Sequence, residues 1–239
     1  MYAPEQDRPA VLDRRTGPYG EVVLRRHGDR LEIIANGCFL MDTSDGRSER
    51  LLVRSALAAL PSEAVAADDA SAAGPGVGPH LLLGGLGVGF SLDEAAAETR
   101  WGRITVVERE AAVLDWHRSG PLGPYSATAR ADARTQLVHA DLLDHLRDTR
   151  DRYDVLCLDI DNGPDWTVTD GNRSLYSPAG LAACRERLAP GGVLAVWSAG
   201  HSAAFAEVLR NNGFCAVRTE ETPVARGVPD VVHFATRPA

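Results

Sequence analysis

Hydrophobic and polar positions divide residues 1–60 into a polar start, short β-prone runs and one helix. Residues 1–17 are polar and aperiodic, which predicts a flexible tail. β-Prone runs at 21–26, 30–35 and 38–41 are separated by two turn signals, HGD at 27–29 and NG at 36–37. Residues 48–60 repeat apolar positions at helical spacing, and a proline follows. We therefore expect residues 18–60 to form a small antiparallel β unit and a helix.

From residue 80 onward, apolar strands alternate with helices. The predicted strands are LLLGGLG, RITVVERE, QLVHAD, YDVLCLDID, VLAVWSA and VVHFATRP, and the predicted helices are SLDEAAAETR, LLDHLRDTR, SPAGLAACRERLAPGG and FAEVLRNNGF. This alternation is typical of a mainly parallel sheet with helices on both faces. The expected fold class is α/β and Rossmann-like, with residues 61–79 as an Ala-, Gly- and Pro-rich linker and 80–239 as the main domain.

Composition and charge exclude several classes of function. All 25 basic residues of the 239-residue chain are Arg, so chemistry that needs a lysine, such as a Schiff base or a Walker A loop, is excluded. A net charge of −8 argues against a nucleic-acid partner, and no apolar run has the roughly 20 residues of a membrane span. The four cysteines and seven histidines lack metal-ligand spacing, so we expect no metal and a reducing, cytoplasmic location.

Glycines and acids recur where the predicted strands end. The glycines of LLLGGLGVGF follow a buried strand and precede a helix, where backbone can approach a ligand closely. Glu108, Asp141 and Asp159 come at the ends of the next three strands. Ligands of open α/β sheets bind at this edge, where an acid can accept hydrogen bonds from ribose hydroxyls. The pattern predicts adenosine binding, with Gly84, Gly85 and Gly87 in contact with the ligand. The rival ligand, NAD, is disfavoured because the spacing is not G-x-G-x-x-G.

The chain resembles the spermidine/spermine synthase family, a group of polyamine aminopropyltransferases within the class I S-adenosylmethionine-dependent methyltransferase fold. The resemblance runs from about residue 21 to the C-terminus. It rests on LEIIANGCFLM, LLLGGLGVGF, VVERE, HAD, YDVLCLDIDNGP, SLYSPAGL and LAPGGVLAVWSA. It implies a spermidine synthase-like transferase that moves an aminopropyl group from decarboxylated S-adenosylmethionine to a small-molecule amine and releases methylthioadenosine. It also implies a homodimer.

The resemblance implies roles for individual residues. Glu108 would bind the ribose, and Asp141 the adenine amine. Asp159, the first residue of the family's D-x-x-D motif, would anchor the acceptor amine and accept its proton, since a free amine has a pKa of about 10.4. Asp161 would substitute for the second carboxylate of that motif. Tyr176 stands at an aromatic position of the family and is either a site residue or a packing residue.

The candidate substrate-binding residues are Asp45, Glu49, Asn162 and Trp166. Three departures from the family pattern accompany them: Gly87 replaces an Asp that helps to hold the donor's amine, Asn162 replaces the second Asp of D-x-x-D, and no Tyr accompanies Asp45 and Glu49. The departures leave two alternatives open. One is methyl or aminocarboxypropyl transfer from ordinary S-adenosylmethionine. The other is a non-catalytic protein that retains the nucleoside pocket.

Overall fold

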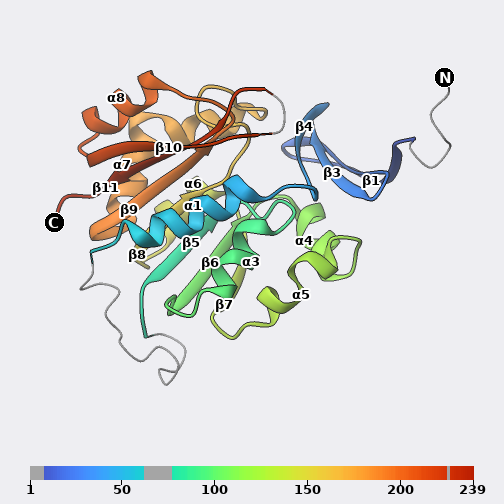
Figure 1. Cartoon of the computed structure of the whole chain (residues 1–239), viewed down its shortest axis with the longest axis horizontal. Helices are drawn as coiled ribbons and strands as arrows, with labels where there is room; N and C mark the ends of the chain where they lie inside the picture. The colour runs from blue at the N-terminus through green and yellow to red at the C-terminus, as the bar shows by residue number, and fades with distance from the viewer. Residues whose placement is uncertain (1–7, 62–76, 225–226) are drawn as a thin grey trace.

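The computed structural model of the chain describes residues 8–61, 77–224 and 227–239, which form two sheets (Figure 1). The small antiparallel sheet has the order β1-β2-β3-β4, with β1 (Ala10–Gly17), β2 (Gly20–His27), β3 (Arg30–Ala35) and β4 (Cys38–Asp42). The large sheet has the order β10-β11-β9-β8-β5-β6-β7. Its strands are β5 (His80–Gly84), β6 (Arg103–Glu108), β7 (Thr135–His139), β8 (Tyr153–Leu158), β9 (Leu188–Ser198), β10 (Cys215–Thr222) and β11 (Asp230–Thr236).

Five strands of the large sheet, β9, β8, β5, β6 and β7, are parallel to one another. β11 runs antiparallel to both of its neighbours, β9 and β10. The mainly parallel α/β sheet and the small antiparallel unit predicted from the sequence are therefore confirmed. The turn signals between the small strands are confirmed as well, since Gly28, Asn36 and Gly37 adopt positive φ angles there.

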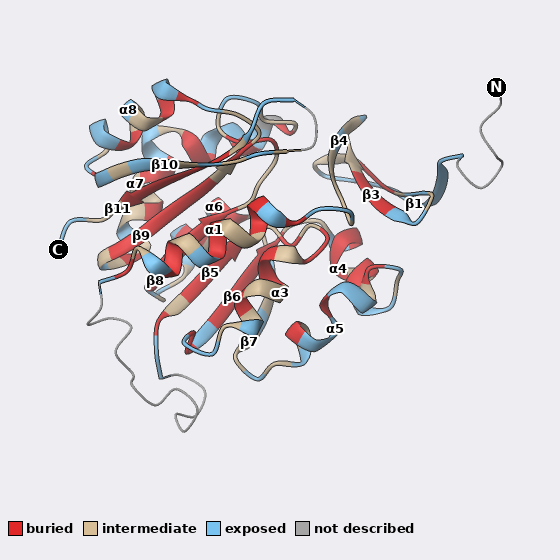
Figure 2. Cartoon of the chain, in the orientation of Figure 1, coloured by how far each residue is buried: buried red, intermediate tan, exposed pale blue. Residues whose placement is uncertain are grey.

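Helices cover both faces of the large sheet (Figure 1). One face carries α1 (Arg47–Ala58), α3 (Phe90–Ala97), α4 (Ala111–Arg118) and α5 (Gly123–Ala131), and the other carries α6 (Leu142–Asp148), α7 (Pro178–Arg187) and α8 (Ala203–Asn211). Side chains alternate between these faces along a strand: in β5, Leu81 and Leu83 join the first core and Leu82 joins the second. The buried residues line the inner surfaces of both layers (Figure 2).

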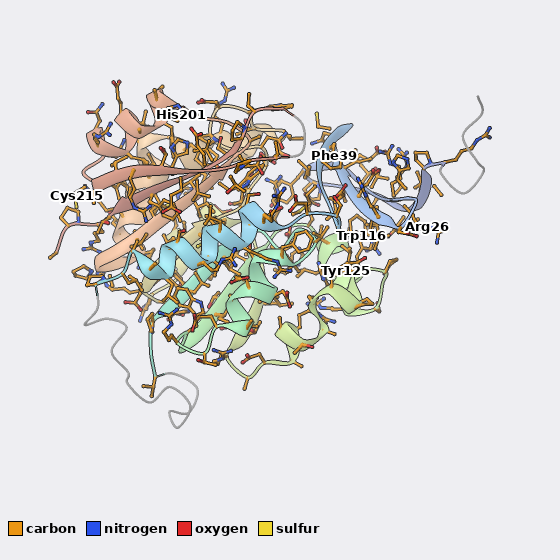
Figure 3. The ribbon with its side chains drawn as sticks, viewed as in Figure 1. Arg26, Phe39, Trp116, Tyr125, His201 and Cys215 are labelled. Carbon is orange, nitrogen blue, oxygen red and sulfur yellow. The ribbon has the colours of Figure 1, made fainter. Side chains whose placement is uncertain are left out.

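The prediction of a flexible tail over residues 1–17 is wrong for its second half, because Ala10–Gly17 forms strand β1. Its side chains are almost all exposed, so no apolar pattern marks it. Antiparallel pairing with β2 along its length holds it instead, together with polar contacts to α4: Trp116 Nε1 donates to Asp13 at 2.8 Å, and Arg15 pairs with Asp115 at 2.7 Å. Figure 3 shows Trp116 projecting from α4 toward the small sheet.

Further elements were absent from the sequence prediction, among them α4, α5 and β10. α4 and α5 are helices of 8 and 9 residues that lie around a Gly- and Pro-containing break, and β10 is a largely exposed edge strand. Short or exposed elements carry little hydrophobic periodicity. Of the predicted linker 61–79, residues 62–76 lie outside the described residues, as does the tail segment 1–7. Among the described helices, none is long and apolar enough to span a membrane.

Candidate active site

A cavity of about 140 Å³ lies at the carboxyl edge of β5, β6 and β8. Small-sheet side chains form its opposite wall, among them Val22, Ile33 and Met41. The strand-end residues of the large sheet that line it are Gly85, Gly87, Glu108, Asp141, Asp159 and Asp161. The parallel register, with Gly84 opposite both Val107 and Leu158, brings three of these strand ends together.

The glycine loop is shaped by close approaches that no side chain would permit. Gly85 has φ +95°, and a β-carbon there would collide with the carbonyl oxygen of Asp159. Gly87 has φ +51°, and the sulfur of Met41 occupies the space that its β-carbon would need. Gly84 packs against Leu142 and is not part of the cavity wall. Two of the three predicted glycines therefore line the cavity.

Glu108 fastens the glycine loop from the end of β6. Its Oε2 accepts a hydrogen bond from the backbone N–H of Leu86 at 2.9 Å, and its Oε1 accepts one from that of Glu110 at 2.7 Å. Burial raises the pKa of this carboxyl, and the two backbone donors oppose that rise. Because each carboxylate oxygen has a second lone pair, the side chain can still accept hydrogen bonds from a ligand's hydroxyls.

Asp141 follows β7 and caps helix α6. Its Oδ1 accepts hydrogen bonds from the backbone N–H groups of Leu143 at 2.9 Å and Asp144 at 3.2 Å. The same side chain lines the cavity. Within the described part of the chain, Oδ2 has no hydrogen-bond partner, so that oxygen is available to a ligand's donor group.

Asp159 lies at the end of β8 and accepts a hydrogen bond from Ser91 Oγ at 3.1 Å. Burial is the main cause that raises the pKa of Asp159, and the charge of Asp230 adds to it. Glu49, in the first turn of α1, has a raised pKa for the same reason, with the charge of Asp159 as the second cause. The two carboxyl groups therefore compete for ionisation, and the first turn of α1 completes a shared acidic site.

A second cavity of about 580 Å³ adjoins the first. Leu40, Met41, Glu49 and Trp197 line both cavities, so the two meet at these side chains. The predicted substrate residues Asp45, Glu49, Asn162 and Trp166 all line the second cavity. Both carboxylate oxygens of Asp45 accept hydrogen bonds from the guanidinium of Arg47, and Trp166 is 59% exposed. The labelled Phe39 of β4 lies on the side of the small sheet that faces this cavity (Figure 3).

The other two candidate residues have different surroundings. Asp161 adopts φ +54° and accepts a hydrogen bond from Asn172 Nδ2 at 2.7 Å, within the wall of the first cavity. Tyr176 lines neither cavity. Its hydroxyl donates to the carbonyl of Ile160 at 3.2 Å and its ring packs edge-on against Phe205. Of the two roles considered for Tyr176, its position fits packing and not contact with the reacting groups.

Several site residues had no signal in the sequence. Arg109 stacks over Tyr19 with 4.5 Å from its Cζ to the ring centre and donates to Asn172 Oδ1. Asn172 belongs to the 3₁₀ helix η2 (Asp170–Tyr176). Asp230 is 182 positions from Ser48 in the sequence, yet it accepts a hydrogen bond from the Ser48 hydroxyl at the start of α1. Only the fold brings these residues together.

The strand order, the reversed β11 and the position of the cavity define a Rossmann-like fold of the class I methyltransferase type, with a cavity beside the glycine loop. Comparison with solved structures shows which proteins of this fold the chain is similar to. A spermidine synthase in complex with the transition-state analogue AdoDATO superposes with a TM-score of 0.75 at 16% identity, over 95% of this chain and 73% of that one. Spermidine synthase from Thermotoga maritima gives 0.69 at 16% identity, over 95% and 72%. No family model and no curated protein matches the sequence.

Proposed function

We propose that the chain transfers an aminopropyl group from decarboxylated S-adenosylmethionine to a small amine and releases methylthioadenosine. The observation that carries the proposal is the junction of the two cavities at Glu49. One cavity offers strand-end acids suited to a nucleoside, and the other offers acidic and aromatic walls suited to a cation. A reaction between two bound molecules needs such a meeting point.

The chemistry is a direct displacement. The lone pair of the acceptor nitrogen forms a bond to the aminopropyl carbon next to the sulfonium, and the C–S bond breaks toward sulfur, which becomes neutral. An acceptor that arrives as an ammonium ion must first lose one proton. In this proposal Asp159 anchors the ammonium at the end of β8 and accepts that proton, Glu108 binds the ribose, and Asp141 binds the adenine amine.

The charges around Asp159 favour the decarboxylated donor. Ordinary S-adenosylmethionine would bring its own carboxylate toward the buried carboxylate of Asp159. Like charges in such a site repel strongly because the surroundings screen them poorly. Arg109 is the one basic side chain among the described residues of the first cavity wall, and it is already engaged with Asn172 and Tyr19. A donor whose chain ends in an amine meets no such repulsion.

A product assay by mass spectrometry tests the proposal. The protein is mixed with either decarboxylated or ordinary S-adenosylmethionine and a panel of mono-, di- and polyamines. We expect methylthioadenosine and an aminopropylated amine with the decarboxylated donor alone. S-adenosylhomocysteine would instead establish methyl transfer, and methylthioadenosine from the ordinary donor would establish aminocarboxypropyl transfer. No product together with tight methylthioadenosine binding would identify a non-catalytic protein.

The variant Asp159→Asn tests the role of the anchor. We expect turnover to fall by about 100-fold or more, because a proton acceptor is lost, with methylthioadenosine affinity nearly unchanged. Asp165→Asn is the matched control, since Asp165 is exposed in the same loop and lines neither cavity. Turnover equal in the two variants would remove Asp159 from the mechanism.

The homodimer and the cytoplasmic location stay predictions from the sequence. The outer strand β1 presents Val11 and Leu12 to solvent at 52% and 39% exposure, which supplies an edge for a second copy. Light scattering of the purified chain decides between a dimer and a monomer.

A further inference from the structure

The hydroxyl of Ser48 lies between two carboxyl groups at the start of α1. Its Oγ is 3.0 Å from Glu49 Oε2 and 2.8 Å from Oδ2 of Asp230, the first residue of β11. Ser48 and Glu49 are buried, and Asp230 is half-buried. A serine hydroxyl has one proton and so donates to one carboxylate at a time. The other contact is a hydrogen bond only if that carboxyl group carries a proton of its own.

The proton belongs on Glu49. Glu49 is the more deeply buried of the two and faces Asp159, whose charge adds to burial in raising the pKa of Glu49 to about 8. Asp230 also has a raised pKa, mainly from burial, but Arg47 beside it opposes the rise. The charged groups around this set are Asp159 at the end of β8, and Asp45 and Arg47 in the segment that leads into α1. At neutral pH protonated Glu49 donates to Ser48, which donates to ionised Asp230.

This hydrogen-bonded chain connects the reacting centre with solvent. Glu49 lines both cavities where they meet, whereas Asp230 lines only the second, beside the exposed Trp166. Trp197 lies at the same junction, and a side-chain hydrogen bond from Trp197 helps to keep Asp230 ionised by opposing the rise in its pKa. α1 packs against β8, β9 and β11 (Figure 1), and the Ser48 hydroxyl at its start is held by Asp230 of β11.

We propose that Ser48 and Asp230 form a proton path, which carries the proton of the acceptor amine from the Asp159–Glu49 pair to water in the second cavity. The inference rests on the proposed aminopropyl transfer, because that reaction releases one proton per turnover. Neither Ser48 nor Asp230 is required to touch the donor, so both are positioning and relay residues.

The steps of the path balance. Glu49 passes its proton to Ser48 Oγ while the Ser48 proton moves to Asp230, and this leaves Glu49 ionised and Asp230 protonated. Asp230 then releases its proton to water in the second cavity. The ammonium ion, held between Asp159 and Glu49, gives one proton to this doubly ionised pair and becomes the free amine that attacks. The pair is again singly protonated, and the Ser48 hydroxyl turns back toward Asp230.

Infrared spectroscopy tests the chain without any assumption about activity. We expect a carboxylic-acid C=O band that disappears as pH rises through about 8 and is missing in Glu49→Gln. The band should shift to higher frequency in Ser48→Ala, where the acid loses its acceptor. Ser55→Ala is the matched control, because Ser55 on the same helix donates to Glu220 at 2.6 Å and neither residue lines the first or the second cavity. The inference is overturned if the band is missing, or if its frequency is the same in Ser48→Ala as in the native chain.

Turnover tests whether the reaction uses the path. Asp230→Asn keeps an acceptor for the Ser48 hydroxyl but cannot take up a proton, so a purely structural role would survive this change. We expect kcat at pH 7 to fall roughly tenfold or more in Asp230→Asn and Ser48→Ala, and not in Glu220→Gln or Ser55→Ala. The deficit should shrink above about pH 8, where Glu49 ionises without the relay.

The outcomes separate this inference from the proposed function. A kcat unaffected by Asp230→Asn, or a deficit that does not change with pH, overturns the proton path while aminopropyl transfer stands. A band that responds to Ser48→Ala in a protein without turnover on any donor overturns the proposed function, and the path's role in catalysis fails with it.

Discussion

The sulfur of Met41, in β4, fills the space next to Gly87 where any larger residue would place its β-carbon. In the family that the sequence resembles, an Asp at this loop position helps to hold the donor's amine. Here a small-sheet thioether and a glycine with φ +51° stand in its place. Any side chain at position 87, a carboxylate included, is thus coupled to Met41 through the contact between the two sheets.

This coupling predicts the behaviour of a double variant. Gly87→Asp alone should lower stability by about 1–2 kcal/mol, because of its left-handed backbone and the collision with Met41. Met41→Ala with Gly87→Asp should provide both room and charge. We expect the double variant to bind decarboxylated S-adenosylmethionine about tenfold or more tightly than Met41→Ala alone, through one charge-assisted hydrogen bond. Calorimetric titration measures this.

Methylthioadenosine provides the control ligand, since it has no amine for the new carboxylate to bind. Its affinity should be equal in the double variant and in Met41→Ala. An equal gain for both ligands would show that the change acts on the nucleoside end of the cavity.

The strand-end residues were predictable because their position follows from one regularity. Each apolar run of the parallel sheet ends at the same edge, so Glu108, Asp141 and Asp159 had to lie near one another once the alternation was recognised. Glu49 was found only through a family resemblance, since an acid in the first turn of a helix is ordinarily a solvated residue. Its burial depends on how α1 packs across β8, β9 and β11.

The remaining site residues depend on tertiary contacts that sequence patterns do not encode. Ser48 and Asp230 are 182 positions apart and belong to elements with no shared motif. Arg109 follows Glu108 directly, but its stacking on Tyr19 requires the small sheet to lie over the carboxyl edge. Strand β1 escaped prediction for a similar reason, because pairing with β2 and polar contacts to α4, and not a buried apolar face, hold it.

Asp141 should determine which base the first cavity accepts. Asn caps a helix about as well as Asp, so Asp141→Asn should leave stability within about 0.5 kcal/mol. Its side-chain oxygen would remain with the backbone of α6 and its amide NH₂ would face the ligand. We expect methylthioadenosine to bind roughly tenfold more weakly, and methylthioinosine, which presents an acceptor at the same position of the base, to bind more tightly.

The comparison with Asp141→Ala separates capping from recognition. Asp141→Ala should lower stability by about 1 kcal/mol, because the helix cap is lost, and its affinity for methylthioinosine should not increase. Equal binding of the two nucleosides by the native chain would show that Asp141 serves only as the cap.

Arg109 should slow the escape of a bound nucleoside. From the end of β6 it contacts Tyr19, in the turn before β2, and Asn172, in η2, and so links these segments across the first cavity. Arg109→Ala should raise the dissociation rate of methylthioadenosine roughly tenfold. Arg109→Lys should leave that rate nearly as high as Arg109→Ala does, since an ammonium group cannot stack and bridge as a planar guanidinium does. Stopped-flow competition measures the rate.

Arg118→Ala is the control for Arg109, because its side chain is 56% exposed on α4 and pairs only loosely with Asp115 at 3.8 Å. If both alanine variants release the ligand at the native rate, Arg109 does not restrain the cavity.

The raised pKa of Asp159 predicts how stability changes with pH. The folded state raises this pKa from 3.8 to about 6, so the unfolded chain ionises first as pH increases. Between these values the folded state binds more protons, and stability falls with rising pH. The free-energy cost of ionising Asp159 in the folded chain is absent below pH 3.8 and complete above pH 6. Asp159→Asn should therefore stabilise the chain at pH 8 by about 1–3 kcal/mol, and by clearly less at pH 5.

Urea unfolding of both proteins at pH 5 and pH 8 measures the difference. Asn can still accept the hydrogen bond from Ser91, so the comparison isolates the charge. Asp29→Asn, in the exposed turn between β2 and β3, should change stability equally at both values. A gain for Asp159→Asn that is the same at pH 5 and pH 8 would mean that the Asp159 carboxylate is no more costly in the folded chain than in water. The carboxylate that is proposed to anchor the ammonium ion would then carry no electrostatic cost in the folded chain.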